Sequence, residues 1–248
     1  MSDSPVLSTR LGITAVGAGQ MPDAPDAWLT KGLARGRLHE FYSDEAQDST
    51  AVVGFSIALA LAGGTAPILW VRKEEDERRA GRLHANGLAE FGLPPDQLIL
   101  VIAADEAGLL RVAADAARCP GLGALVVESR GRAPGLDLTA TRRLMLATEA
   151  SDVTALCIRI GAEPTPSAAA TRWSIAAAPS TSLDADAPGQ PAFDVELLRQ
   201  RGGPAGRRWR VEWNRDERCF SPLPGAGLPL AADRPVALDP PAPVRRTG

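Results

Sequence analysis

The sequence of 248 residues predicts an α/β fold, in which helices flank a mostly parallel sheet and antiparallel strands follow near the C-terminus. Between residues 38 and 160, short apolar runs alternate with helix-like stretches of about 10–15 residues. The apolar runs are continuous, which is typical of strands buried on both faces of a parallel sheet. Beyond residue 160, the segment RWRVEW at 208–213 alternates polar and apolar residues, as a half-exposed strand does.

Each element of this core follows from a local pattern. Strands are expected at 38–42, 67–71, 98–103, 124–127 and 154–160, and helices at 49–62, 73–91, 105–118 and 138–150. Asp48 or Ser49 can cap the first helix, and Asp105 can cap the third. Later strands are expected at 171–176, 193–200 and 207–213. The last two should form an antiparallel hairpin, because turn residues (GGP) lie between them.

Composition divides the chain into three parts. Residues 1–31 form a leader with little periodicity, 32–220 form one core domain, and 221–248 form a Pro-rich tail that we expect to be disordered. No apolar stretch approaches the roughly 18 residues of a membrane helix, and no secretory signal is visible at the N-terminus. The three cysteines lack CxxC spacing, which is typical of reduced thiols. We therefore expect a cytoplasmic protein without membrane contact.

Two residue counts restrict the chemistry. The chain has only two histidines, His39 and His84, which excludes a histidine-rich metal site and argues against a Cys/His zinc module. Neither a metal nor a cofactor is expected. It has only two lysines, Lys31 and Lys73, against 25 arginines. The formal charge of -3 provides no overall attraction to nucleic acid, so any basic surface would have to be local.

The first strand–loop–helix unit is where a nucleotide hydrolase of this architecture would carry its phosphate loop. That loop follows the pattern GxxxxGK[ST], because glycines allow close backbone approach and the lysine contacts the phosphates. Here the segment SDEAQDST, from Ser43 to Thr50, contains no glycine and no lysine, and its three acids would repel a triphosphate. We therefore interpret Ser43, Asp48, Ser49 and Thr50 as positions of a degenerate nucleotide loop. Thr50 alone keeps the residue type expected beside magnesium.

A second candidate position is Glu128, which follows the apolar strand ALVV at 124–127. Nucleotide-binding sheets place a magnesium-orienting carboxylate at this point. Many parallel strands end in an acid, so the position by itself does not indicate an active site. Together with the altered loop, it predicts that the chain is not an enzyme. An active nucleotide hydrolase with an atypical phosphate loop is the alternative.

Clusters of arginine suggest contact with single-stranded nucleic acid. One group follows the strand at 124–127 and continues onto the next helix, and it comprises Arg130, Arg132, Arg142 and Arg143. A second group lies on the predicted hairpin and comprises Arg207, Arg208 and Trp209. Arginine beside an aromatic ring can hold a single strand by charge and stacking. The alternative is that these arginines pair with surface acids, because arginine is nearly the only cation of this chain.

Several segments, taken in order, resemble the ImuA family of RecA-like accessory proteins in bacterial DNA-damage-induced mutagenesis, a family also related to the cell-division inhibitor SulA. The segments are GLARGRLHE at 32–40, PILWV at 67–71, LAEFGL at 88–93 leading to LILV at 98–101, RCPGLGALVVE at 118–128, LDLTATRRL at 136–144, AATRW at 169–173 and VELLRQRGG at 195–203. The segment 136–144 is the most specific match. The resemblance covers about residues 32–213, through the order and spacing of its segments.

The resemblance implies a RecA-like fold and a non-catalytic accessory role in SOS-induced translesion DNA synthesis. The partners that it implies are an ImuB-type polymerase homologue, an error-prone replicative-type DNA polymerase and RecA, with single-stranded DNA as a further candidate. In RecA-like folds, the loops after the fourth and fifth core strands contact single-stranded DNA, and they correspond here to about 129–136 and 161–168. A SulA-like inhibitor of cell division is the alternative that the same resemblance leaves open.

Overall fold

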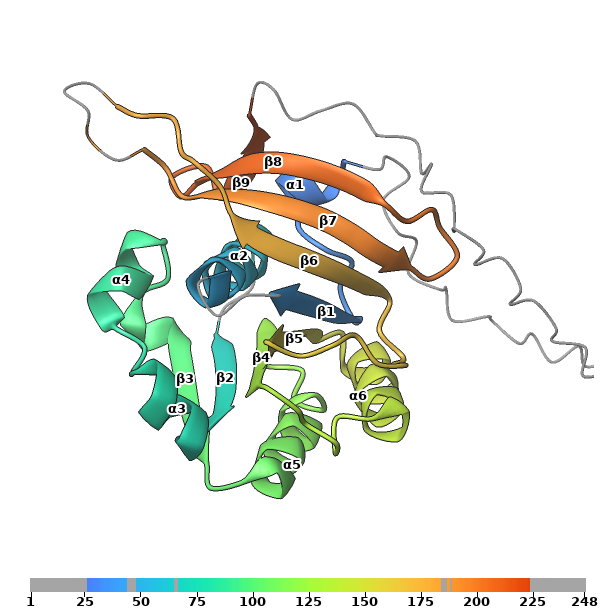
Figure 1. The fold of residues 1–248 in the computed structure, drawn as a ribbon. Helices are drawn as coiled ribbons and strands as arrows, with labels where there is room; N and C mark the ends of the chain where they lie inside the picture. The colour runs from blue at the N-terminus through green and yellow to red at the C-terminus, as the bar shows by residue number, and fades with distance from the viewer. Residues whose placement is uncertain (1–25, 44–47, 65–66, 184–186, 188, 224–248) are drawn as a thin grey trace, which may run out of the picture.

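One sheet joins all the strands of this computed structural model, which describes residues 26–43, 48–64, 67–183, 187 and 189–223 (Figure 1). The strands are β1 (Leu38–Ser43), β2 (Ile68–Lys73), β3 (Leu98–Ala103), β4 (Ala124–Arg130), β5 (Thr154–Ile160), β6 (Thr171–Ala177), β7 (Ala192–Gln200), β8 (Arg207–Asn214) and β9 (Cys219–Pro222). Their order is β3-β2-β4-β5-β1-β6-β7-β8-β9. The first six strands in this order are parallel, and the last three add antiparallel. The predicted fold class is therefore confirmed.

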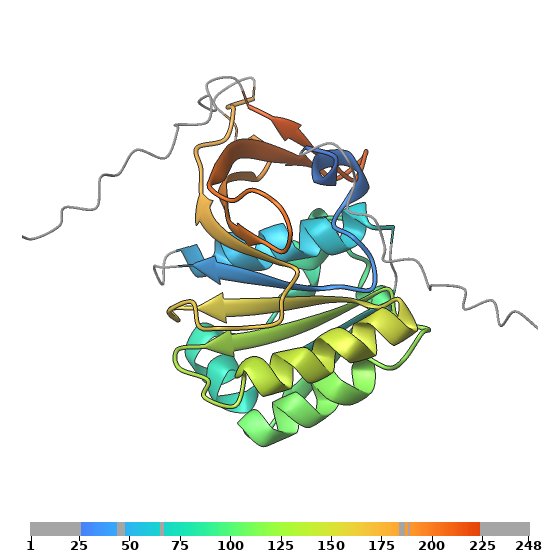
Figure 2. The same ribbon diagram turned by 90° about the vertical axis from the view of Figure 1, so that its right-hand side faces the viewer.

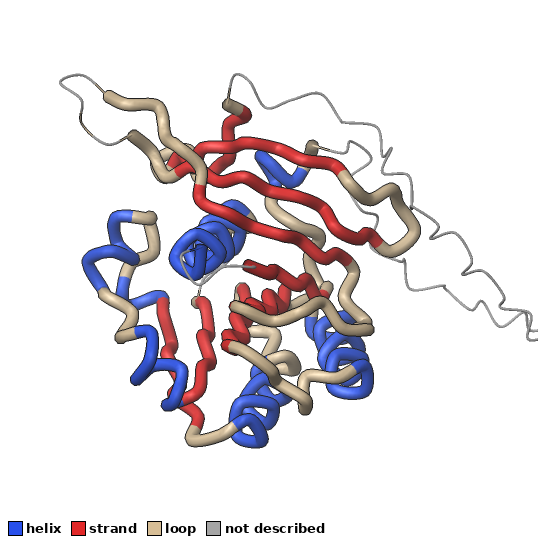
Figure 3. The backbone as a smooth tube through the Cα atoms, viewed as in Figure 1, coloured by secondary structure: helices blue, strands red, loops and turns tan. Residues whose placement is uncertain are grey.

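Helices cover both faces of the parallel part (Figures 2 and 3). They are α1 (Trp28–Lys31), α2 (Ser49–Ala62), α3 (Glu74–Ala80), α4 (Ala85–Glu90), α5 (Glu106–Ala116) and α6 (Leu138–Ser151). The core on the α2 face is separate from the core beneath α5 and α6. In the part of the chain that the structure describes, none of the helices combines the length and the apolar character that a membrane span requires.

Helix α2 is apolar around its whole circumference because the sheet encloses it. The parallel strands lie on one side, and the antiparallel strands curve over the other side (Figure 1). The ring of Phe55 lies 5.5 Å from that of Phe193 in β7 and 5.1 Å from that of Phe220 in β9. A helix buried on all sides needs apolar residues in every direction, which explains the sequence STAVVGFSIALALA.

The packed core extends the expected domain 32–220 at both ends. Trp28 in α1 is buried, and its ring contacts those of Phe55, Trp173 and Phe220 at 5.8, 5.3 and 5.5 Å. The core therefore begins inside the expected leader. Among the described residues it ends with β9, which reaches two residues past 220 and had no sequence-based prediction. The rest of the expected leader, 1–25, and of the expected tail, 224–248, lies outside the described residues, so the disorder of the tail stays a prediction.

The prediction of a single helix at 73–91 is wrong. Helix α3 ends at Ala80, and α4 begins only at Ala85. Gly81 has a φ of 84°, which an α-helix does not allow, and its carbonyl accepts a hydrogen bond from Nη1 of Arg72 at 3.2 Å. A buried arginine of the preceding strand thus contacts the chain at the break, and helical periodicity does not reveal this contact.

Candidate functional site

The carboxyl ends of β1, β4 and β5 lie at one edge of the parallel sheet, and this edge carries the predicted nucleotide-loop positions. Ser43 ends β1 fully buried, and its hydroxyl makes no hydrogen bond with any described residue. Asp48 precedes α2, but its carboxylate accepts a hydrogen bond from the Ala177 amide at 2.9 Å and so ties α2 to β6. Ser49 and Thr50 begin α2, and Thr50 is exposed. Residues 44–47 lie outside the described residues.

The carboxylate of Glu128 is enclosed by donors of the protein itself. Its side chain is only 1% exposed. Oε1 lies 3.3 Å from Nη2 of Arg72 and 3.2 Å from Nε of Arg130, while Oε2 accepts a hydrogen bond from Nε1 of Trp70 at 3.1 Å. Strands β2 and β4 are neighbours with Trp70 opposite Val126, so Trp70, Arg72 and Glu128 lie on the same face of the sheet. Two guanidinium groups and an indole N–H thus surround the carboxylate of Glu128.

Sequence reasoning assigned no role to Trp70, and the other unassigned residue of this cluster is Arg72. Its side chain is 2% exposed, and besides Glu128 it donates to the carbonyls of Gly81 and Asp76. The available signal was a charged residue at the carboxyl end of an otherwise apolar strand. The nearby Lys73 pairs with Asp76 at 3.5 Å. Both cations at the end of β2 are therefore paired with acids of the protein.

The first predicted arginine group divides into two kinds of residue. Arg130 is half-buried and paired with Glu128, so a carboxylate of the protein already neutralises its charge. Arg132, Arg142 and Arg143 are exposed and form no ion pair with any described residue. These three side chains remain available to an anionic partner on the surface that the loop 131–137 and α6 share.

The second predicted group is engaged within the protein. Arg207 pairs with Asp26 at 3.3 Å, and Arg208 pairs with Glu196 at 2.9 Å. Trp209 donates a hydrogen bond to Asp26 at 2.8 Å, and its ring packs 5.5 Å from that of Trp28. These contacts favour the alternative reading, in which the arginines pair with acids and the tryptophan packs in the fold.

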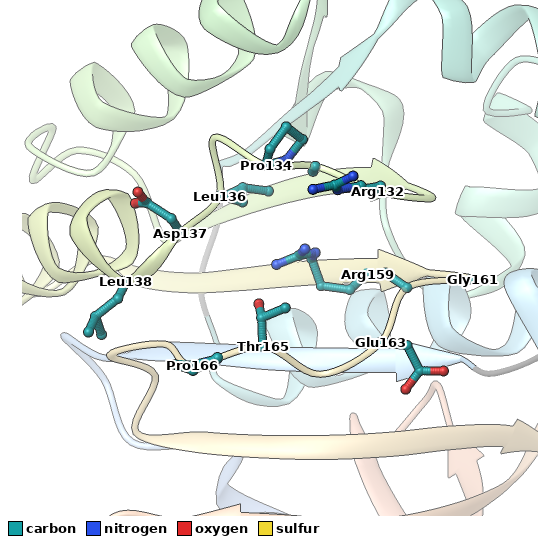
Figure 4. A pocket seen from close by; sticks show the side chains of 12 residues that line it. Arg132, Pro134, Leu136, Asp137, Leu138, Arg159, Gly161, Glu163, Thr165 and Pro166 are labelled. Atoms are coloured by element: carbon teal, nitrogen blue, oxygen red, sulfur yellow. The ribbon is translucent and has the colours of Figure 1, made fainter.

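The loops expected to contact DNA, 129–136 and 161–168, together line one pocket of about 720 Å³ (Figure 4). The pocket lies on the α6 face of the sheet, away from Glu128. Its lining consists of Arg132, Ala133, Pro134, Leu136, Asp137, Leu138, Arg159, Gly161, Ala162, Glu163, Thr165 and Pro166. Arg159, from β5, is a residue that sequence reasoning missed, since it looks like an isolated cation within the apolar strand TALCIRI.

A buried polar network holds the second of these loops against the sheet. Glu40 in β1 is fully buried, and its Oε2 accepts hydrogen bonds from Ser167 at 2.8 Å and from Nε of Arg172 at 3.1 Å. The hydroxyl of Tyr42 donates to the same oxygen at 3.3 Å. Burial, followed by the nearby Glu40 charge, raises the pKa of Tyr42 to about 12. Glu40 is thus the counter-ion of Arg172.

The comparisons with known proteins identify the architecture. No family model matches the chain, and no curated protein matches it. Among solved structures, the chain is similar to one described as the crystal structure of the RadB recombinase, at 16% sequence identity and a TM-score of 0.53. The match covers 79% of this chain and 94% of that chain. With its mostly parallel sheet, flanking helices and C-terminal antiparallel strands, the chain has a RecA-like fold.

Proposed function

We propose that the chain is a non-catalytic RecA-like accessory protein of SOS-induced translesion DNA synthesis, acting in the cytoplasm through protein and single-stranded DNA contacts. The observation that supports a non-catalytic role is the enclosure of Glu128 by Arg72, Arg130 and Trp70. Both oxygens of this carboxylate are engaged by donors of the protein, which disfavours coordination of a metal ion. The segments that resemble the ImuA family support the translesion role.

Titration with ATP and Mg²⁺ tests the non-catalytic role. We expect no binding heat at micromolar ATP, because the loop from Ser43 to Thr50 lacks the glycines and the lysine that hold phosphates, and Glu128 is occupied. Isothermal titration calorimetry measures this, with an ATP-hydrolysing recombinase as the positive control. Micromolar binding, or ATP turnover that disappears in a folded Glu128→Gln variant, would contradict the proposal and favour a nucleotide hydrolase.

The edge strand β3 is the surface that favours a protein partner. It is the end strand of the sheet, so its outer backbone groups face no neighbouring strand in the described chain. Ile99, Leu100 and Ile102 are 46%, 39% and 39% exposed. An exposed apolar edge strand is a template for pairing with a strand of another chain. The expected partners are the ImuB-type polymerase homologue, the error-prone replicative-type polymerase and RecA.

Charging this edge should weaken partner binding about tenfold or more. The variants Ile99→Lys and Leu100→Lys place a cation on β3 without filling a buried space, since both positions are partly exposed. Each purified partner is passed over the immobilised chain, and the dissociation constant is measured by surface plasmon resonance. The matched control is Leu146→Lys on α6, where the leucine is 55% exposed. If the parent chain binds none of the three partners, the translesion role is contradicted. If it binds a purified division protein instead, the SulA-like alternative is favoured.

Single-stranded DNA should bind through the arginines that lack an acidic partner. We expect the triple variant of Arg132, Arg142 and Arg143 to alanine to reduce the slope of log K against log salt by about 2, at roughly 0.7 per lost phosphate contact. Fluorescence anisotropy of a labelled oligothymidylate at two or more salt concentrations measures the slope. Arg130 is left in place because it already pairs with Glu128.

The control for this experiment removes the same number of arginines from another surface. Arg78, Arg79 and Arg82 lie in and just after α3, which packs against β2 and β3 at the far end of the sheet. Their triple alanine variant should keep the slope of the parent. Equal slopes for the parent and both variants would place the DNA contact elsewhere or show that there is none.

A further inference from the structure

Arg159 is a buried cation without a counter-ion. Its residue is 3% exposed, and its Nε–H group has no hydrogen-bond acceptor among the described residues. Its guanidinium lies 6.0 Å from the centre of the Tyr42 ring, and it forms no ion pair with a described residue. A buried charge is costly unless it is paired and hydrogen-bonded. Arg159 therefore has no direct anionic partner among the described residues.

The acids around Arg159 do not supply that anion. Glu40 is engaged through Oε2 by Arg172, Ser167 and Tyr42, and its Oε1, although buried without a hydrogen-bond partner, makes no ion pair with Arg159. Asp137 caps α6 by accepting a hydrogen bond from the Ala140 amide at 2.8 Å. The carboxylates of Asp137 and Glu163 both point away from Arg159 in Figure 4. None of these carboxylates pairs with the guanidinium, so a direct anionic partner would have to come from outside the described residues.

A second unsatisfied donor lies next to Arg159. Ser129 in β4 is its register partner across the parallel pair of β4 and β5, so the two side chains lie on the same face of the sheet. The hydroxyl of Ser129 is also buried without a hydrogen-bond partner. Buried polar groups are nearly always satisfied in folded proteins. Two unsatisfied groups side by side, one of them lining a cavity, are the arrangement expected of a binding site rather than of a core.

The lining of the pocket defines the class of ligand. Arg132 and Arg159 contribute two positive charges, and Asp137 and Glu163 offset them, so the pocket lacks the positive excess that a polyphosphate or a nucleic-acid strand requires. Most of the remaining lining is apolar, and it includes Ala133, Pro134, Leu136, Leu138 and Pro166. A planar guanidinium matches a carboxylate through two parallel hydrogen bonds. The ligand should therefore be a single carboxylate with an apolar body.

We propose that this pocket binds an organic carboxylate, with the carboxylate on the guanidinium of Arg159 and a short apolar body against Leu136 and Pro166. Arg132, exposed at the same cavity, adds a second cation toward the carboxylate. The carboxylate belongs either to a free small acid or to an acidic side chain in an apolar segment of a partner protein. This site is on the opposite face of the sheet from Glu128. It shares Arg132 with the proposed single-stranded DNA surface, but carboxylate binding at Arg159 does not depend on that function.

Arginine Nε–H spectra of the ¹⁵N-labelled full chain test the site directly. The signal of Arg159 is assigned as the one missing from an Arg159→Met variant. Addition of 4-methylpentanoate should shift this signal in a saturable way, and 4-methylpentanamide, which has the same body without the charge, should bind about tenfold or more weakly. An Arg132→Ala variant is changed only at an exposed position, so it should bind the carboxylate more weakly and keep the fold.

Two further arms separate the sources of the carboxylate. A capped Leu-Glu-Leu peptide that binds more tightly than the free acid assigns the pocket to a protein segment, and the reverse order assigns it to a small acid; both results support the site. No shift of the Arg159 signal with either carboxylate at millimolar concentration would overturn the proposal. A shift with oligothymidylate alone would overturn it too, because it would assign the pocket to phosphate.

The melting temperature distinguishes a ligand-binding arginine from a structural one. Arg159→Met removes a charge that has no partner within the described chain, so the variant should melt at the same temperature as the parent or higher. Arg172→Met is the matched control, since it leaves Glu40 buried without its cation and should melt lower. If both variants melt lower to the same extent, Arg159 has a structural partner and the proposal fails. If Arg159→Met does not fold, Arg159→Lys, which keeps the charge, assigns the signal instead, and the carboxylate titration of the parent and of the Arg132→Ala variant decides the question.

Discussion

Replacing Arg72 by methionine should lower the free energy of unfolding by about 3 kcal/mol, at the lower end of the range for a broken buried ion pair. The side chains of Arg72 and Glu128 are 2% and 1% exposed, so Glu128 would lose one of its two cations where water cannot replace it. Arg130 and Trp70 would still contact the carboxylate, which limits the loss. Equilibrium unfolding in urea, monitored by tryptophan fluorescence, measures the change.

A second variant shows whether the loss comes from the ion pair. The double variant Arg72→Met with Glu128→Gln removes both charges and keeps an acceptor for Trp70, so it should recover most of the lost stability. Arg79→Met is the matched control, because Arg79 pairs with Glu75 on the surface and should contribute less than about 1 kcal/mol. An equal loss for Arg72→Met and Arg79→Met would mean that the buried pair does not hold this end of the sheet together.

Lowering the pH should destabilise the protein through His39. Burial of the ring is the main cause that lowers the pKa of His39 from 6.5 to about 4. The hydrogen bond to the Ala34 carbonyl acts in the opposite direction, and the charge of Arg37 lowers the pKa further. The unfolded chain therefore binds a proton at a pH where the folded chain does not. The stability that the neutral His39 ring contributes is complete above pH 6.5 and is lost as the pH falls toward about 4. It amounts to about 3 kcal/mol, at about 1.4 kcal/mol for each unit of pKa.

Urea unfolding of the parent and of a His39→Gln variant at several values between pH 7 and pH 4 measures this contribution. Carboxylates titrate in both proteins, so the difference between the two pH profiles isolates the histidine. The variant should be less stable at neutral pH, since it alters the contacts to Thr171 and Ala34, but its profile should be flatter. His84→Gln changes an exposed histidine and should keep the profile of the parent. Parallel profiles for the parent and His39→Gln would show that the ring is protonated in the folded state.

Local sequence patterns were sufficient for most of the elements and for the altered loop. Helix α2 and strands β3 and β5 have the predicted bounds. Asp105 caps α5 as expected, by accepting a hydrogen bond from the Gly108 amide at 2.7 Å. The absence of glycine and lysine between Ser43 and Thr50 is likewise readable from the chain alone. These features depend on residues that are neighbours in sequence, so periodicity, caps and loop composition predict them.

Tertiary structure alone decided the features that carry the proposals. Trp70 and Glu128 are 58 positions apart, and they meet only because β2 lies beside β4 in the sheet. Arg72 of the same buried cluster also binds the carbonyl of Gly81, where the helix expected at 73–91 is interrupted. Trp28 joins the core because β9 and α2 bring Phe220 and Phe55 to it. The unpaired state of Arg159 depends on where every nearby acid points. The partners of a side chain cannot be predicted from that residue alone, because burial and charge pairing depend on how distant strands are ordered and how they pack.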